Sequence, residues 1–204
     1  MRVARQRSAK RVAMRQTVLA LAAAFALLGA APSPRATDVA IETGAGTIVV
    51  RLDPAHAPRT VANFLRYVDA RRYDGAEFYR TVRAAPGDAH PPRIQVIQGG
   101  LEHSASARML APIAVESTRT TGLHNVPGSI AMARTNDPNS ATSEFFINLA
   151  DDTWLDGQNF PDGQGYAVFG RVVRGFDVVR TIQQSPARGE ELTPPIRIVR
   201  IRRV

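Results

Sequence analysis

The sequence predicts one mainly β domain, an antiparallel β-barrel covered by helices, and three features support this fold class. Many short β-rich segments are separated by glycine, proline and other turn residues, whereas helical spacing of apolar residues occurs in two segments. Strands and helices do not alternate as in βαβ units, and no internal repeat is present. With 204 residues, 44% of them hydrophobic, the chain can build one good core, and two full domains are not expected.

The predicted strands begin with a hairpin of residues 39–43 and 47–52, which are β-rich and flank glycines able to adopt the positive φ of a tight turn. Gly99 and Gly100 are expected to end a later strand, and residues 102–128 to be irregular. The other predicted strands are residues 78–82, 94–98, 129–133, 144–149, 167–173 and 196–204. The last of them alternates Ile and Arg over much of its length, which predicts one solvent-exposed face.

Two amphipathic helices are predicted to cover the barrel. The first begins at Pro58, because proline in the first helical position loses no hydrogen bond, and the second spans residues 175–184. In both, apolar residues recur at helical spacing and form one stripe that can face a core. They are Val61, Phe64, Leu65 and Val68 in the first helix, and Phe176, Val179 and Ile182 in the second.

Nearly all of the formal net charge of +8 comes from the first 36 residues. They contain seven of the 26 Lys and Arg residues and none of the 18 Asp and Glu residues, so the rest of the chain is close to neutral. Binding to DNA or RNA requires a basic face on the folded domain, and the charge distribution does not predict one. We therefore expect no nucleic-acid partner.

Residues 1–36 have the order of a secretory signal peptide, with a basic stretch, an uncharged run rich in Ala and Leu, and small residues after it. Cleavage is expected after Ala31 or Ala36, which leaves a domain of residues 37–204 in the periplasm with no membrane span. An uncleaved membrane anchor is the weaker alternative, because the apolar run is shorter than the roughly 20 residues that a spanning helix needs. Met14 is an alternative start that gives a leader of ordinary length.

Several kinds of catalytic site are excluded or disfavoured by composition and spacing. The chain contains no cysteine, which rules out disulfides, thiolate metal sites and a cysteine nucleophile. The four histidines are scattered without the spacing of metal ligands, and no phosphate-binding glycine motif, HExxH or GxSxG motif is present. We expect neither a metal nor a cofactor.

Three motifs occur in a specific order along the chain. They are FYR at residues 78–80 with QGG at 98–100, GSIAMAR at 128–134, and SEFFI at 143–147 followed by WLDG at 154–157. With these motifs the sequence resembles the cyclophilins, the cyclosporin-binding family of peptidyl-prolyl cis-trans isomerases, over essentially the whole domain. Residues 132–148 resemble the periplasmic bacterial members in particular.

The resemblance implies a cyclophilin-like closed antiparallel eight-stranded β-barrel with two capping helices and an outer groove that binds X-Pro peptides. Its catalytic residues would be Arg80, Gln98 and Phe146, with Phe146 as the floor of the proline pocket. The substrate-binding residues would be Val96, Ala133, Arg134, Glu144, Trp154, Leu155 and Tyr166. Strand alternation independently predicts that one of Phe145 and Phe146 faces the core and the other faces outward. For Trp154, a surface-packed aromatic is the alternative.

The predicted residue types suit isomerisation of a peptide bond, in which no bond breaks and no cofactor is needed. Amide resonance creates a barrier of about 18 to 20 kcal/mol, and the unassisted reaction takes roughly 10 to 100 s. A fixed guanidinium can donate to the prolyl carbonyl or toward the amide nitrogen as conjugation is lost. Such hydrogen bonds stabilise the twisted state more than they stabilise either planar isomer.

The sequence departs from the family pattern beside the expected groove. Residues 84–93 form an insertion, and Gln95 and Val96 stand where the family usually has Phe and Met. Tyr166 stands where His is common, so we expect weak cyclosporin affinity. Glu144 replaces a Gln, and if its carboxylate reaches Arg80 it would compete with substrate for the guanidinium.

Two functions from different classes follow. The first is a monomeric periplasmic peptidyl-prolyl cis-trans isomerase that assists folding of exported proteins and acts on their proline-containing segments. The alternative is a non-catalytic proline-peptide binder or holdase chaperone that uses the same groove. Arg80, Gln98 and Phe146 favour the enzyme, whereas Gln95, Glu144 and the loop of residues 83–93 favour the binder.

Overall fold

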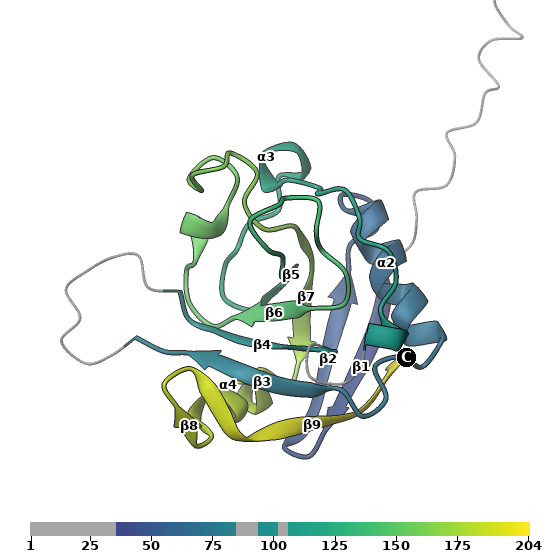
Figure 1. Cartoon of the computed structure of the whole chain (residues 1–204), viewed down its shortest axis with the longest axis vertical. Helices are drawn as coiled ribbons and strands as arrows, with labels where there is room; N and C mark the ends of the chain where they lie inside the picture. Colours follow the sequence, from purple (N-terminus) through teal and green to yellow (C-terminus); the bar gives the residue numbers. More distant parts are fainter. Residues whose placement is uncertain (1–35, 85–93, 102–105) are drawn as a thin grey trace, which may run out of the picture. The chain divides into compact units, whose positions relative to one another are not determined.

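The computed structural model describes residues 36–84, 94–101 and 106–204, and these residues form a closed antiparallel barrel (Figure 1). Eight strands follow the order β1–β2–β7–β5–β6–β4–β3–β9, and β9 pairs back onto β1 to close the ring. They are β1 (Thr37–Thr43), β2 (Gly46–Leu52), β3 (Glu77–Val82), β4 (Val96–Gly100), β5 (Ser129–Met132), β6 (Phe145–Asn148), β7 (Val168–Arg174) and β9 (Glu191–Arg203). The predicted closed eight-stranded barrel is confirmed.

The helices and minor elements lie around this ring. They are α2 (Pro58–Asp69), α3 (Thr118–Thr121), α4 (Phe176–Gln184), the 3₁₀ turns η2 (Ser106–Arg108) and η3 (Thr153–Leu155), and the two-residue strand β8 (Ala187–Arg188), which pairs with the start of β9. None of the helices in the described part of the chain is long and apolar enough to cross a membrane. The predicted leader lies outside the described residues apart from Ala36, as does the predicted insertion apart from Ala84.

The opening hairpin and both predicted helices are confirmed. Helix α2 begins at Pro58 and buries Phe64 completely against the aromatic residues of the barrel interior. Its ring lies 5.6 Å from that of Phe145 in an edge-on arrangement, a geometry that aromatic pairs favour. Helix α4 buries Val179 and Ile182, as its stripe predicted. The core therefore lies inside the barrel and between the barrel and the two helices that cover it. The outer face of the other strands is not part of this core.

Strand β4 continues through both glycines that were expected to end it. Gly99 pairs with Phe78 and Gly100 with Glu77, so the ladder with β3 runs to the end of the strand. A Cβ atom at Gly99 would lie 2.6 Å from the Glu77 carbonyl oxygen, a distance that real Cβ atoms do not show. Glycine acts here by permitting close approach of two backbones instead of by making a turn.

Two other expectations about element bounds were wrong. Strand β9 begins at Glu191 and not at residue 196. It pairs with β3 at Glu191 and again from Ile196, and Pro194 and Pro195 lie in the irregular stretch between these two places. Proline is tolerated there because the stretch does not need its missing N–H for the ladder. Helix α3 lies inside the segment that was expected to be irregular. With four residues between Ser117 and Gly122, it is too short to produce an apolar period.

Candidate functional site

Arg80 and Gln98 are brought together by the pairing of β3 with β4, in which they are direct cross-strand partners. Nη1 of Arg80 donates a hydrogen bond of 2.8 Å to Oε1 of Gln98. Nε of Arg80 donates a hydrogen bond of 2.8 Å to one carboxylate oxygen of Glu190, and Nη2 forms an ion pair with the same oxygen at 2.7 Å. The guanidinium is therefore held from two sides at the barrel surface.

The hydrogen bonds continue from Gln98 to a second carboxylate. Nε2 of Gln98 donates to the Tyr79 hydroxyl at 2.8 Å, and that hydroxyl donates to Glu144 at 2.9 Å. Glu144 also accepts the Leu101 amide at 2.6 Å. Glu144 thus reaches Arg80 through Tyr79 and Gln98, and the carboxylate bonded directly to Arg80 is that of Glu190. The direct Glu144–Arg80 pair considered from the sequence is not what the structure shows.

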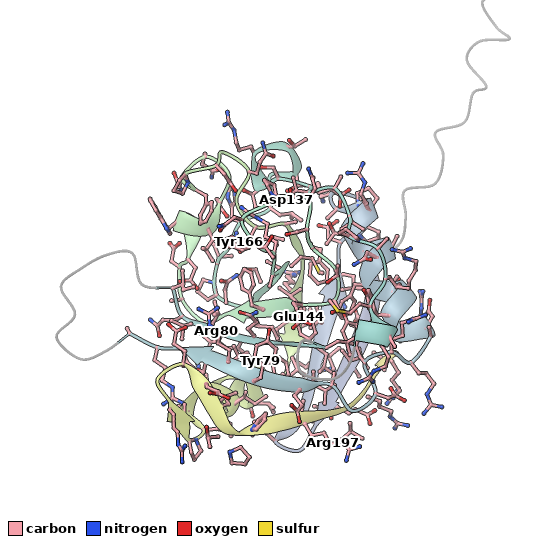
Figure 2. The ribbon with its side chains drawn as sticks, in the orientation of Figure 1. Tyr79, Arg80, Asp137, Glu144, Tyr166 and Arg197 are labelled. Carbon is pink, nitrogen blue, oxygen red and sulfur yellow. The ribbon has the colours of Figure 1, made fainter. Side chains whose placement is uncertain are left out.

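Two backbone features make this arrangement fit. The pairing of β3 shifts between Phe78 and Arg80, so that the hydroxyl of Tyr79 joins the same network as Arg80 although the two residues are adjacent in a strand. Gly100 has φ of 149°, and a Cβ atom there would lie 2.5 Å from the Glu144 carboxylate. The glycine therefore makes room for the carboxylate. Figure 2 shows Tyr79, Arg80 and Glu144 over neighbouring strands, with Tyr166 on the far side of Glu144 from Tyr79.

An apolar row continues from Arg80 across the outer face. Gln98 pairs with Phe146, Phe146 with Ala131, and Ala131 with Val168, so these side chains share one face of the sheet. Phe146 and its neighbours form a separate apolar group, here named the outer cluster, which consists of Val82, Val96, Ala131, Phe146, Leu155 and Val168. Phe145 belongs to the interior core instead. The prediction that the two phenylalanines face opposite sides is confirmed.

Tyr166 and Arg134 border the outer cluster. The Tyr166 ring packs edge-on against Phe146 with centroids 5.6 Å apart, and edge-on against Phe160 at 5.2 Å. The Arg134 guanidinium lies 4.7 Å from the centroid of the Tyr166 ring and bonds to Asp162. Burial alone would raise the pKa of Asp162, but hydrogen bonds from the amides of residues 164 and 165 and the charge of Arg134 hold it below its ordinary value. Arg134 is therefore fixed as part of the wall.

A cavity of about 420 Å³ lies beside Gln98 and the wall of Arg134. Its lining combines polar side chains with Ala133 and Met109. The remaining lining residues are Thr135, Ser140, Thr142 and Glu144. The predicted residues Gln98, Ala133, Arg134 and Glu144 therefore meet around one hollow, while Val96 and Leu155 lie in the outer cluster.

Trp154 is placed differently from the other predicted residues. It is 41% exposed and does not belong to the outer cluster, although Leu155 next to it does. Its position on η3 agrees with a surface aromatic at the edge of the site. Gln95, which replaces an expected aromatic, is half-buried, and its main-chain N–H donates to the Asp152 carboxylate at 3.0 Å.

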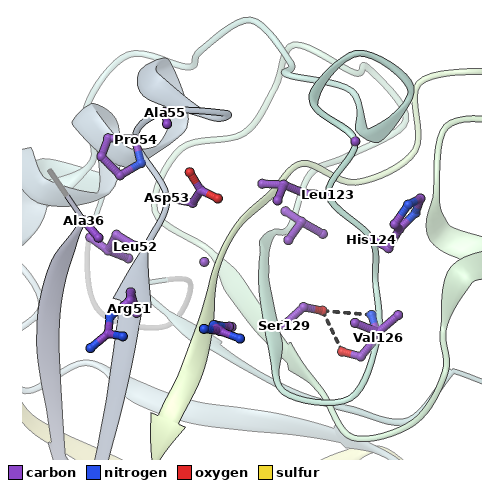
Figure 3. A pocket seen from close by; sticks show the side chains of 14 residues that line it. Ala36, Arg51, Leu52, Asp53, Pro54, Ala55, Leu123, His124, Val126 and Ser129 are labelled. Atoms are coloured by element: carbon purple, nitrogen blue, oxygen red, sulfur yellow. Dashed lines mark hydrogen bonds between the residues drawn. The ribbon is translucent and has the colours of Figure 1, made fainter. Parts of the chain in front are cut away.

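A larger cavity, of about 580 Å³, lies over β2, β7 and β5 (Figure 3). Arg51, Asp53 and His124 border it, together with apolar side chains such as Leu123 and Val126. None of the ten residues predicted from the sequence as catalytic or substrate-binding lines this cavity. Size alone therefore does not identify the site that the motifs predict.

The chemistry available at the smaller site is donation of hydrogen bonds beside an apolar floor. In the residues that the structure describes, no group of three or more His, Asp or Glu side chains is arranged to hold a metal ion. A guanidinium has five N–H donors, and those of Arg80 make one hydrogen bond from Nε to Glu190 and one from Nη1 to Gln98, while Nη2 pairs with the Glu190 oxygen. The second N–H of Nη1 and the N–H of Nη2 that points away from Glu190 remain for a carbonyl oxygen or nitrogen of a ligand seated on Phe146.

Sequence reasoning missed Tyr79 and Glu190. Simple strand alternation places Tyr79 on the face opposite to Arg80, and the shift in pairing that changes this has no signal in the FYR motif. Glu190 lies in a turn more than 100 residues from Arg80, and nothing in the local sequence links the two.

Comparison with known proteins gives one consistent family. The model of the cyclophilin type peptidyl-prolyl cis-trans isomerase family matches residues 38–203. The chain is 42% identical over 164 residues to peptidyl-prolyl cis-trans isomerase cyp18 of Streptomyces antibioticus, covering 78% of this chain and 92% of that protein. It is 39% identical over 171 residues to peptidyl-prolyl cis-trans isomerase A of Dickeya dadantii, covering 82% and 80%.

A solved structure has the same fold at lower sequence identity. It is a cyclophilin type isomerase of Cryptosporidium parvum, determined in the presence of the dipeptide Ala-Pro. The TM-score is 0.64 and the identity 21%, and the match covers 80% of this chain and 96% of that one.

Proposed function

The chain belongs to the cyclophilin-type peptidyl-prolyl cis-trans isomerases, and from that premise we propose that it isomerises X-Pro bonds in exported proteins with Arg80 as its electrostatic centre. The observation that supports this assignment most directly is the row of Arg80, Gln98 and Phe146 across β3, β4 and β6. It places a fixed hydrogen-bond donor next to an apolar floor on the outer face of the barrel.

The geometry suggests how the rotation is accelerated. Phe146 and the outer cluster hold the pyrrolidine ring, while the two remaining N–H groups of Arg80 donate to the prolyl carbonyl or toward the amide nitrogen as it loses conjugation. These bonds are stronger in the twisted state than in either planar isomer, and this difference lowers the barrier. A 10⁵-fold acceleration requires about 7 kcal/mol of such stabilisation, at about 1.36 kcal/mol per tenfold.

Val96, Leu155, Ala133 and Tyr166 would complete the binding surface around the prolyl ring and its neighbours. Arg134 and the cavity beside Gln98 would bind the substrate residues on one side of the prolyl ring, and Trp154 would lie at the edge of the binding surface. We expect weak cyclosporin binding, because Gln95 and Tyr166 change the surface that the drug would cover. Isothermal calorimetry with the purified protein measures this affinity, and tight binding would contradict the expectation.

The periplasm is the proposed location, and the basic and apolar order of residues 1–36 supports it. A protein in that compartment would meet newly exported chains before they fold, which makes their X-Pro segments the proposed substrates. We propose that it acts as a monomer.

A non-catalytic proline-peptide binder is the second candidate, and one observation favours it. Gln95 contributes no aromatic ring to the pocket, and its main chain is held in place by the bond from its backbone N–H to Asp152. Such a protein would bind proline peptides through Phe146 without turnover.

The test is the rate of cis-to-trans exchange of a short X-Pro peptide, measured by NMR with the purified protein and its Arg80→Ala variant. We expect strong catalysis by the wild type and a loss of about 10² to 10³-fold on substitution, the range for removing a single preorganised donor. A folded wild type that binds the peptide without catalysis would select the binder.

A further inference from the structure

We propose that Glu190 is a positioning residue for Arg80, and that it determines which N–H groups of the guanidinium face the substrate. Glu190 faces the edge formed by Nε and Nη2, and one of its carboxylate oxygens accepts a hydrogen bond from Nε at 2.8 Å and lies 2.7 Å from Nη2. This inference rests on the proposed function, because it assigns a role in the same reaction.

The main chain holds Glu190 in place opposite Arg80. Arg80 pairs with Glu191 where β9 begins, and the Thr81 amide donates to the Glu190 carbonyl at 2.8 Å. The turn between β8 and β9 is therefore bonded to β3, the strand that carries Arg80. The barrel thus fixes the backbone of Glu190, and only its side chain has to be oriented for the contact with Arg80 to form.

The donor count shows what the contact does. Nε has one N–H, and Nη1 and Nη2 have two each. Glu190 accepts from Nε and pairs with Nη2, and Gln98 accepts from one N–H of Nη1. The N–H of Nη2 that points away from Glu190 and the second N–H of Nη1 are left for the substrate. Without Glu190, a single hydrogen bond from Nη1 to Gln98 would hold the guanidinium, and its plane could rotate about that bond.

The expected effect is modest because the pair is accessible to water. The side chains of Arg80 and Glu190 are 37% and 54% exposed, and exposed ion pairs contribute little net attraction. The role is therefore orientation of a donor instead of added binding energy. We expect kcat to fall while KM stays nearly constant, because the peptide is held by the outer cluster and not by Glu190.

The test compares Glu190→Gln with Glu191→Gln, which removes an exposed carboxylate from the next residue, the first of β9. The expected result is a three- to five-fold lower kcat for Glu190→Gln with unchanged KM, and less than a 1.5-fold change for Glu191→Gln. In the wild type, raising the salt concentration from 0.05 to 0.5 M should lower kcat, because salt screens the pair. The Glu190→Gln variant should lose this dependence.

A second readout does not depend on catalysis. The Nε–H proton of Arg80 should exchange slowly with water in the wild-type NMR spectrum and quickly in Glu190→Gln. Wild-type kcat in Glu190→Gln, or a higher kcat, would overturn the proposal, and a higher value would show that Glu190 withholds Arg80 from substrate. A wild type without isomerase activity would instead refute the proposed function, even if the Nε–H signal depends on Glu190.

Discussion

The surface over β3, β4 and β6 and the cavity over β2, β7 and β5 both combine an arginine with apolar side chains. Arg51, at the larger cavity, gives Nε and Nη2 to the two carboxylate oxygens of Asp38 at 2.8 and 2.9 Å. Arg80 gives the same edge to Glu190 and one further N–H to Gln98, its direct neighbour in the row that leads to Phe146. The two arginines are alike in chemistry and differ in what lies next to them.

The other polar groups are hydrogen-bonded at both places, and the difference lies in where the networks end. At the larger cavity, Asp53 binds His56 at 2.9 Å, and the ring of His124 binds buried Asp156 at 2.7 Å. Asp156 connects through Asn125 and Asn148 to Ser129, so this network holds the loops together and does not end on an arginine beside an apolar floor. At the smaller site, Arg80, Gln98, Tyr79 and Glu144 form one chain of hydrogen bonds. A connected network fixes the direction of its end groups. Donors held in register with an apolar floor identify the site better than volume does.

After the loss expected for Arg80→Ala, the largest expected effect in this comparison is that of removing the floor. Phe146→Ala should lower kcat/KM about 30-fold, because burial of the prolyl ring against it is worth about 2 kcal/mol. Val126→Ala, at the edge of the larger cavity, is the matched control and should change kcat/KM less than two-fold. The peptide exchange assay measures both, with thermal unfolding to show that each variant is folded. Equal losses in the two variants would contradict the division of the surface.

Residue patterns predicted the floor better than they predicted the network. Alternation in β6 was enough to separate Phe145 from Phe146, because a regular strand leaves the side chains no other choice. Tyr79 depends on a shift in strand pairing, and Glu190 on a turn brought in by β9, and both are products of the closed barrel. The start of β9 was placed too late, at residue 196, because the strand also includes Pro194 and Pro195 and the residues before them. The local sequence does not show where the pairing of a strand shifts, because the shift depends on the neighbouring strands of the closed barrel.

A smaller effect is expected at Asp152, which lies between the two regions. Its carboxylate accepts the Gln95 amide and its own amide donates to the carbonyl of Asn125, whose neighbour His124 borders the larger cavity. Burial raises the pKa of Asp152 to about 6. The folded state therefore binds more protons than the unfolded state between about pH 4 and 6, and the free energy of unfolding falls as pH rises through that window.

Asp152→Asn should remove this penalty and keep an acceptor for Gln95. We expect the free energy of unfolding at pH 7.5 to rise by about 1 to 2 kcal/mol, with a weaker pH dependence between pH 4 and 6. Urea unfolding at pH 4.5 and 7.5 measures both quantities. Asp151→Asn, at the exposed neighbouring residue, is the control and should retain most of the wild-type pH dependence. If the two variants have the same slope, Asp152 does not titrate as described.

The smallest effect is expected at Glu144, at the opposite end of the network from Glu190. Because it acts on Arg80 through Tyr79 and Gln98, Glu144→Gln should change kcat/KM less than two-fold. A glutamine oxygen can still accept from Tyr79, and Gln98 still holds Nη1 of Arg80 through its own strand pairing. A rise above two-fold in the exchange assay would show instead that Glu144 competes with substrate for Arg80. An unchanged rate would leave Glu190 as the carboxylate that sets the orientation of Arg80, and the network would then be asymmetric about Gln98.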